Sequence, residues 1–237
     1  MLLEVIVQTV DDALAAEDGG ADRLEVVREL EVGGLTPSLS LVRGIQAVTS
    51  LPLRVMVREN AGFGVGPGEL PILRAAVTSL QALHVDGVVM GFAQDGEIAV
   101  RDLARVLEPT PGLRVTFHRA FDTLRSPLAA VEILAGLPQI DRVLTDGGTG
   151  PPIERSVRLA ELGERARALG ADLTVIAGSR VDDESLAVFA ASGCVREAHV
   201  GRAARDGNKA GGRVSPARVR RLRQIADGTS LAPASTV

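Results

Sequence analysis

The sequence predicts a single closed (β/α)8 barrel, a TIM barrel, that spans residues 1–226 and has an unusually polar interior. Short apolar runs and amphipathic segments alternate eight times along the chain, which is typical of parallel strands joined by helices. The length of 237 residues suits one such barrel. An open doubly wound sheet is the alternative, but Gln8, Thr9 and Val10 follow the first run, where a dinucleotide-binding sheet needs glycines.

Eight runs rich in branched apolar residues predict the strands. They are short enough for a barrel and are separated by turn residues. They are Leu2–Val7, Arg23–Val27, Leu53–Val57, Gly87–Met90, Arg114–Phe117, Arg142–Thr145, Asp172–Ile176 and Glu197–Val200.

Amphipathic periodicity between these runs predicts the helices, and capping residues support their starts. Ser38 follows Pro37, Pro127 follows Ser126, and Asp182 precedes an acidic first turn. The predicted helices are 10–17, 37–48, 68–83, 100–107, 127–134, 153–169, 182–191 and 217–225.

The composition predicts a soluble cytoplasmic protein with neither a membrane nor nucleic acid among its partners. The net charge is -4, and no apolar run approaches the length of a membrane span. The first residues show neither the basic flank nor the cleavage site of a signal peptide. The small, polar segment 227–237 is expected to be a disordered tail. A homodimer is expected because twofold symmetry is the commonest form of assembly.

The rare side chains exclude several kinds of chemistry. Cys194 is the only cysteine, so an internal disulfide and a thiolate metal cluster are both excluded. Lys209 is the only lysine, which disfavours Schiff-base mechanisms. Since the chain has no Tyr and no Trp, acid-base catalysis must come from histidines or carboxylates.

Charged residues inside the predicted strands are expected to face the barrel interior, because helices cover the outer face. Alternation then places Glu4, Arg23, Glu25 and Arg54 inside, together with Glu197. Buried charges of both signs must form ion pairs, and these pairs are either structural or functional. The same rule points Met56, Arg58, Thr116, His118, Val143, Thr145 and His199 inward.

The active site of such a barrel lies at the carboxyl ends of its strands. Arg58, His118 and His199 all fall there, whereas His84 and Cys194 precede strands and belong to the opposite end. Only two histidines can therefore meet, so a tri-histidine zinc site is excluded. No metal ligand set is predicted from the residues, because structural or acid-base histidines are the better interpretation.

Glycines after the last two predicted strands suggest a site for an anion. Gly178 and Ser179 follow one strand, and Gly201 and Arg202 follow the other. Backbone amides in such loops often bind phosphate in barrels. Glycine also serves turns for purely conformational reasons, so both interpretations remain open.

The segment Val115–Asp122, with the sequence Val-Thr-Phe-His-Arg-Ala-Phe-Asp, closely resembles the signature of the CutC family. Further similarity lies in segments 3–5, 19–25, 33–38, 86–89 and 196–199. The resemblance implies a single-domain cytoplasmic barrel linked to copper homeostasis, in which copper(I) is bound by some members.

The chain departs from the family pattern in the residues that face a ligand. The family's two copper-associated cysteines correspond to Ile6 and Val27, which leaves Met56 as the main inward sulfur. Copper(I) prefers soft thiolate or thioether ligands, so copper is a cofactor here by resemblance only. A second arginine that the family carries after the third strand is also missing, since Glu59 and Asn60 follow Arg58.

Two functions and a structural alternative follow from these residues. As an enzyme, the protein would use His118 as its acid-base group, hold a small phosphorylated or carboxylated metabolite with Arg58 and Arg119, and orient these groups with Glu25 or Asp122. As a CutC-like protein, it would handle copper. In the third interpretation the interior ion pairs are only structural and the partner is a second copy of the chain.

Overall fold

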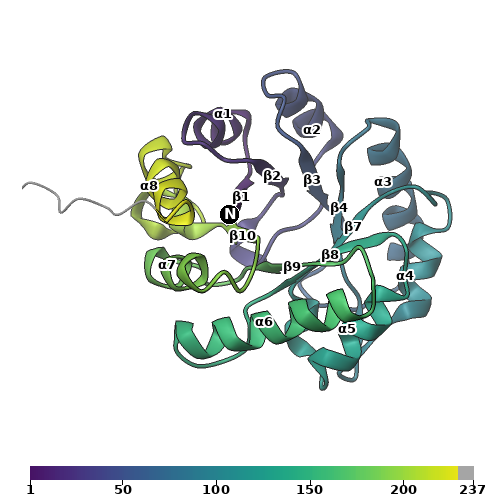
Figure 1. Ribbon diagram of the computed structural model, residues 1–237. Helices are drawn as coiled ribbons and strands as arrows, with labels where there is room; N and C mark the ends of the chain where they lie inside the picture. The colour runs from purple at the N-terminus through teal and green to yellow at the C-terminus, as the bar shows by residue number, and fades with distance from the viewer. Residues whose placement is uncertain (229–237) are drawn as a thin grey trace, which may run out of the picture.

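The computed structural model describes residues 1–228 and confirms the closed barrel. The parallel strands have the spatial order β1-β10-β9-β8-β7-β4-β3-β2, and pairing of β1 with β10 closes the ring. Figure 1 shows the strands surrounded by helices. The barrel strands are β1 (Leu2–Val7), β2 (Arg23–Val26), β3 (Leu53–Met56), β4 (Gly87–Met90), β7 (Val115–Phe117), β8 (Ile140–Thr145), β9 (Thr174–Ala177) and β10 (Glu197–Val200).

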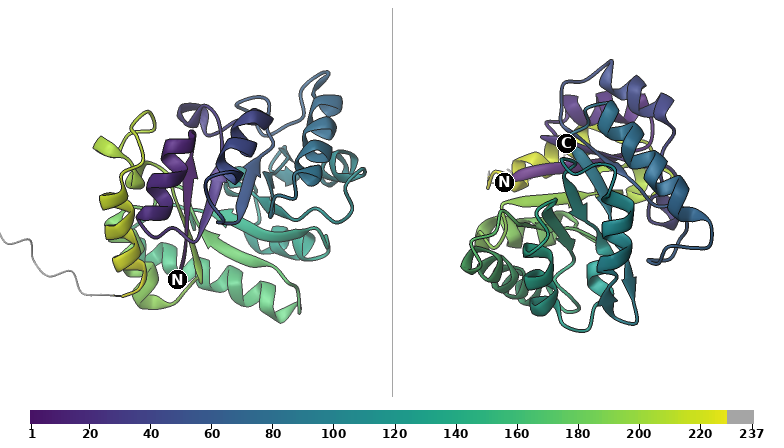
Figure 2. Two further views of the ribbon diagram at one scale, coloured as in Figure 1. Left: turned by 90° about the horizontal axis from the view of Figure 1, so that it is seen from above. Right: turned by 90° about the vertical axis from the view of Figure 1, so that its right-hand side faces the viewer.

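The helices form a continuous outer layer and start close to the predicted caps (Figure 2). Ser38 accepts a hydrogen bond from the backbone N–H of Leu41, and Asp182 forms a reciprocal capping box with Ser185. No helix within residues 1–228 is both long and apolar enough to cross a membrane. The helices are α1 (Val10–Asp18), α2 (Leu39–Gln46), α3 (Glu69–Ala82), α4 (Val100–Leu107), α5 (Pro127–Ala135), α6 (Pro152–Ala168), α7 (Asp183–Ser192) and α8 (Pro216–Ala226).

A small hairpin and several 3-10 turns were not predicted. The hairpin joins β5 (Ala93–Gln94) to β6 (Glu97–Ile98) through Asp95 and Gly96, both with positive φ. Asp-Gly is a known signal for this tight turn, so the sequence did contain the evidence. The 3-10 turns are η1 (Leu30–Val32), η2 (Arg119–Thr123), η3 (Arg202–Ala204) and η4 (Asp206–Asn208). The tail predicted from residue 227 lies, from residue 229 onward, outside the described part of the chain.

Two apolar clusters divide the core. The larger one fills the space between strands and helices and contains the outward side chains Val5, Val26, Val55 and Val88. The smaller one lies inside the barrel and consists of Ile6, Val27, Met56 and Val89. Alternation along the strands therefore assigns the two faces correctly for β1, β2 and β3.

The predicted orientation of β8 was wrong. Val143 packs in the outer core, and Arg142 and Leu144 are the inward residues of this strand. An irregularity in the pairing with β7, where Val115 pairs with Ile140 but Thr116 pairs with Arg142, leaves Asp141 as an extra residue before this segment. From Arg142 onward the strand alternates regularly, so the charge of Arg142 indicates the inward face, and placing Val143 there conflicts with the rule that charged strand residues face the interior.

One end of the barrel interior is built on Arg54, which is fully buried. Its guanidinium binds both carboxylate oxygens of Asp141 at 2.8 and 2.7 Å and donates to Asp86 at 2.6 Å. Gly87 makes room for it, because a Cβ at this position would lie 2.6 Å from Nη1 of Arg54. Asp141 also pairs with Arg142.

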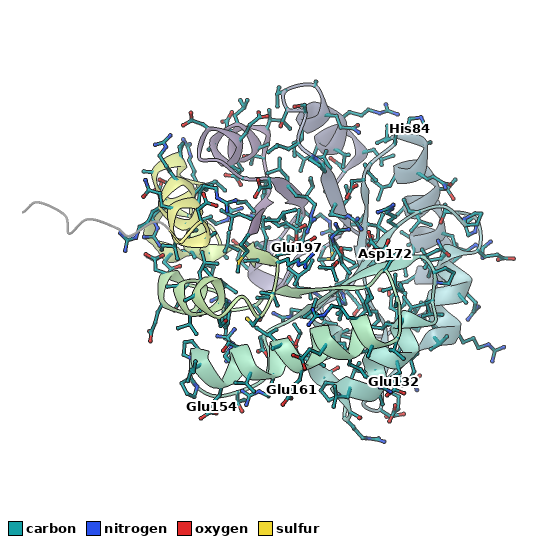
Figure 3. All side chains as sticks on the ribbon, viewed as in Figure 1. His84, Glu132, Glu154, Glu161, Asp172 and Glu197 are labelled. Carbon is teal, nitrogen blue, oxygen red and sulfur yellow. The ribbon has the colours of Figure 1, made fainter. Side chains whose placement is uncertain are left out.

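The ion pairs continue from Arg142 across the barrel. Arg142 donates to Glu197 at 2.9 Å, and Glu197 also accepts from Arg23. Arg23 pairs with Glu4, and Glu4 bonds to His199. Figure 3 labels Glu197 in the middle of the ring, far from the peripheral Glu132. The interior is therefore a connected chain of alternating charges, as the unusually polar sequence of the strands predicts.

Replacing Arg54 with methionine should lower the free energy of unfolding by about 3 kcal/mol, because Asp141 would remain buried with fewer partners. Chemical denaturation followed by circular dichroism measures the change. The matched control is Arg165→Met, which removes an arginine paired with Glu132 while both side chains are more than 40% exposed and should cost below about 1 kcal/mol. An equal decrease in the free energy of unfolding in the two variants would contradict a special role of the ion pairs inside the barrel.

Candidate functional site

A cavity of about 320 Å³ opens at the carboxyl ends of the strands. Its wall includes the inner apolar cluster, and its mouth is formed by the loops after β7, β9 and β10. Neither His84 nor Cys194 lines it, as their position before strands predicts. The predicted site residues that do line it are Glu25, His118, Arg119, Ser179, His199, Gly201 and Arg202.

The polar floor of the cavity is formed by Glu25 and His199, which β2 and β10 bring together across β1. The Nε2 atom of His199 lies 3.3 Å from Oε2 of Glu25. On its other side, Nδ1 of His199 lies 2.7 Å from Oε1 of Glu4. Both side chains of the floor are more than 90% buried, so this pair is shielded from bulk water and held by one ordered partner, Glu4.

The floor holds a proton at neutral pH. Burial raises the pKa of Glu25 to about 7, although the charge of His199 opposes this shift. Burial lowers the pKa of His199, but the carboxylates of Glu25 and Glu4 outweigh it and raise the pKa above the usual value. Burial likewise disfavours the ionised form of Glu4, yet Arg23 and His199 hold its pKa well below the usual range. Glu25 and His199 therefore share a proton beside an ionised Glu4.

The apolar wall above this floor occupies the place where a thiolate copper site is expected from the family. Ile6, Val27 and Met56 all line the cavity. Gly201 belongs to the same wall, because a Cβ there would lie 2.8 Å from Cδ1 of Ile6. Met56 supplies the only sulfur among the lining residues. The donors here do not fit a copper(I) site built on thiolates.

His118 is a neutral hydrogen-bond donor on the cavity wall. Its Nδ1 accepts the backbone N–H of Ala120 at 3.2 Å, which places the ring proton on Nε2. Phe63 contacts the ring edge-on, with centroids 5.4 Å apart. Burial, together with the nearby Arg58 and Arg119, lowers the pKa of His118 to about 3. A ring with this pKa donates a hydrogen bond at neutral pH but carries no ionisable proton there.

Arg58 does not line the cavity. Its guanidinium donates to the carbonyl oxygens of Gly33, Gly34, Ala61 and Gly62, which belong to the loops after β2 and β3. It also lies over the Phe63 ring at 5.0 Å. Its hydrogen bonds thus hold two loops together, whereas the sequence predicted that Arg58 would bind an anionic ligand.

Asp122 lies in a second cavity, of about 340 Å³, between η2, α5 and α6. Its Oδ1 accepts hydrogen bonds from the Thr145 hydroxyl at 2.5 Å and from the backbone N–H of Asp146 at 3.2 Å. The predicted inward position of Thr145 was therefore wrong, for the same reason as that of Val143. The structure does not bring Asp122 into the cavity of His118 and Glu25.

Cationic side chains surround the mouth. Arg119 and Arg202 are exposed and form no ion pair with any residue from Met1 to Gly228. Arg180 also lines the mouth but pairs with Asp146. Ser179 lies beside it with a positive φ of 54°, whereas the predicted Gly178 packs against Leu144 outside the lining.

Sequence reasoning missed Asp182 and Asn208 as residues of the mouth. Asp182 was recognised only as a helix cap, and it performs that role while also lining the cavity. Asn208 comes from the basic, glycine-rich loop after β10, with a positive φ of 55°. The Gly207-Asn208 pair is a turn signal. It predicts where the loop bends, but it does not predict how the loop folds back over the barrel.

Comparisons of the sequence and of the structure with known proteins all find CutC proteins. The model of the CutC family matches residues 1–204. The human copper homeostasis protein cutC homolog is 34% identical over 190 residues, covering 78% of this chain and 67% of its own. A family protein CutC from Mesorhizobium japonicum is 39% identical over 175 residues, covering 71% and 67%. A solved structure from Streptococcus agalactiae, described as a copper homeostasis protein CutC, superposes with a TM-score of 0.76 at 25% identity and covers 85% and 98% of the two chains.

The lowered pKa of His118 predicts a specific dependence of stability on pH. Between pH 6.5 and about 3 the unfolded chain binds a proton at this histidine and the folded protein does not, so acid destabilises the fold. His118→Gln should therefore lose less stability than the wild type between pH 7 and pH 5, by about 2 kcal/mol. Urea denaturation at the two pH values measures the difference, and parallel losses in both proteins would contradict it.

Proposed function

The chain belongs to the CutC family, and we propose that it is an enzyme that acts on a small anionic metabolite, phosphorylated or carboxylated. The observation that carries this proposal is the separation of charge within one cavity. Arg119 and Arg202 at the mouth form no ion pair within the described part of the chain, while Glu25 and His199 share a proton on the floor. A ligand bound in this cavity has its anionic group at the arginines and its reacting end at the floor.

The floor pair is the better candidate for acid-base catalysis than His118. A group exchanges protons most effectively when its pKa lies near the working pH, and Glu25, with a pKa of about 7, meets this condition. His118, with a pKa of about 3, does not. Its Nε2–H instead suits a carbonyl or hydroxyl oxygen of the ligand, the role that neutral histidines have in other barrels.

The copper homeostasis named for the human relative receives less support from the residues of this chain. Ile6 and Val27 present methyl groups to the cavity, and Cys194 lies outside it. Copper(I) would have to rely on one thioether, Met56, and on imidazoles. We therefore give the anionic metabolite precedence over copper as the ligand of the cavity.

Anion binding is tested with a panel of small phosphorylated and carboxylated metabolites and thermal unfolding as the readout. Active members of the panel should raise the melting temperature of the wild type. Arg119→Gln and Arg202→Gln should each weaken binding by about 10- to 100-fold, because each removes a charge-assisted hydrogen bond.

The matched control is Arg101→Gln, which removes an exposed arginine of α4 that does not line the cavity. It should bind as the wild type does. Absence of stabilisation by every anion in the panel, or equal weakening in the control, would refute the proposed ligand class.

Copper(I) binding gives an independent test. The intact protein and the Met56→Leu and His118→Gln variants should show the same weak affinity in a competition titration with a chromogenic copper(I) chelator, because no thiolate is available. A tight site in the wild type that disappears in either variant would restore copper handling as the function.

A further inference from the structure

Glu25 has an unusual environment for a buried carboxylate. Its side chain is only 4% exposed and lines the cavity. Within residues 1–228 its one polar contact is Nε2 of His199, at 3.3 Å. A buried carboxylate without full hydrogen bonding is costly, so the position calls for a further positive partner from the cavity.

His199 is oriented in the way that metal-binding histidines are. Its Nδ1 is bonded to Oε1 of Glu4 at 2.7 Å, and the other oxygen of Glu4 is bonded to Arg23. This arrangement leaves Nε2 as the free nitrogen beside Glu25. A carboxylate that holds the second nitrogen of a ligand histidine is the usual outer partner in metal sites. Glu4 takes this position with Oε1, while Arg23 holds its Oε2.

The distance between the two free ligand atoms suits a metal ion. With metal–ligand bonds of about 2.1 Å, atoms 3.3 Å apart subtend an angle of about 105° at the ion. This angle lies between the tetrahedral and octahedral values. The remaining coordination positions open into the cavity that Glu25 and His199 line.

The local charge also favours a cation. The groups that face the pair are Glu4 from β1, Arg23 from β2, and Glu197 from β10, which is bound in turn by Arg142 of β8. Together with Glu25, three carboxylates face two guanidinium groups. An ionised Glu25 beside a neutral His199 therefore leaves one uncompensated negative charge inside the barrel.

We propose that Glu25 and His199 bind a divalent cation of the zinc class at the floor of the cavity, with Glu4 as the positioning residue of His199. One imidazole and one carboxylate are ligands that Zn²⁺ accepts. Two protein ligands leave the ion open, so water or an anionic ligand oxygen completes its coordination. The site requires no sulfur and differs in this respect from a thiolate copper site.

The cation site goes beyond the proposed function and does not depend on it. The ion takes the place of the proton that Glu25 and His199 share. The metal-free protein thus offers a ligand an exchangeable proton, and the loaded protein offers it an open coordination position.

The test uses Zn²⁺ itself with the full-length protein freed of metal by chelation. Isothermal titration should show one zinc ion per chain. Glu25→Gln and His199→Gln should abolish binding, and Glu4→Gln should weaken it by about 10- to 100-fold. His84→Asn is the matched control, because His84 lies exposed at the periphery (Figure 3) with a positive φ of 54° that Asn tolerates; it should bind as the wild type does.

X-ray absorption of the zinc-loaded wild type keeps the test valid if a variant fails to fold. The expected spectrum has one imidazole and otherwise oxygen ligands. Absence of zinc binding, survival of binding in both Glu25→Gln and His199→Gln, or a spectrum with sulfur or several imidazoles would overturn the inference. Anion binding without zinc binding would overturn the cation site and leave the proposed function intact. Zinc binding without anion binding would refute the proposed function and leave the cation site intact.

Discussion

The burial of alternating charges inside the barrel is the constraint on which the rest of the structure depends. A barrel of this kind is ordinarily filled by branched apolar side chains, but here the ion pairs run from Asp86 and Arg54 at one end to Glu4 and His199 near the other. Each charged side chain neutralises its neighbours. Removing any one of them would therefore leave a partner buried in a low-dielectric interior without its counter-charge. This series of ion pairs ends at Glu25, whose carboxylate has no guanidinium partner among residues 1–228. The floor of the cavity therefore carries an incompletely paired carboxylate.

The same interior connects the structural ion pairs to the wall of the cavity. Glu4 both closes the structural chain with Arg23 and orients the imidazole of His199. The sequence left open whether the ion pairs are structural or functional, and the structure divides them by position. Arg54 and Asp141 lie at the end remote from the cavity and serve the fold, whereas Glu25 and His199 line the cavity. Glu4 belongs to both groups.

Much of the fold was predictable because strand alternation and helix caps are local signals. The strand order, the inward charges and the end of the barrel that carries the cavity follow from residues such as Glu4, Arg23 and Ser38. The irregularity opposite Val115 was not predictable, since it depends on how β7 and β8 pair, but the charge of Arg142 does indicate the inward face of β8. Among the predicted site residues, His118 and His199 reach the cavity, whereas Asp122 lies in another one. Strand ends identify the correct face of a barrel, but the loops decide which residues share a cavity, and their paths depend on tertiary contacts.

Arg58 has a consequence for how a ligand enters. By binding carbonyl oxygens of the loops after β2 and β3 at once, it fixes this side of the entrance before any ligand arrives. Arg58 thereby serves preorganisation: these loops lose little conformational entropy when a ligand binds. An entrance of this kind selects by size and shape at the moment of encounter. The glycine-rich loop after β10, which supplies Asn208, borders the same side, because only β1 separates β10 from β2.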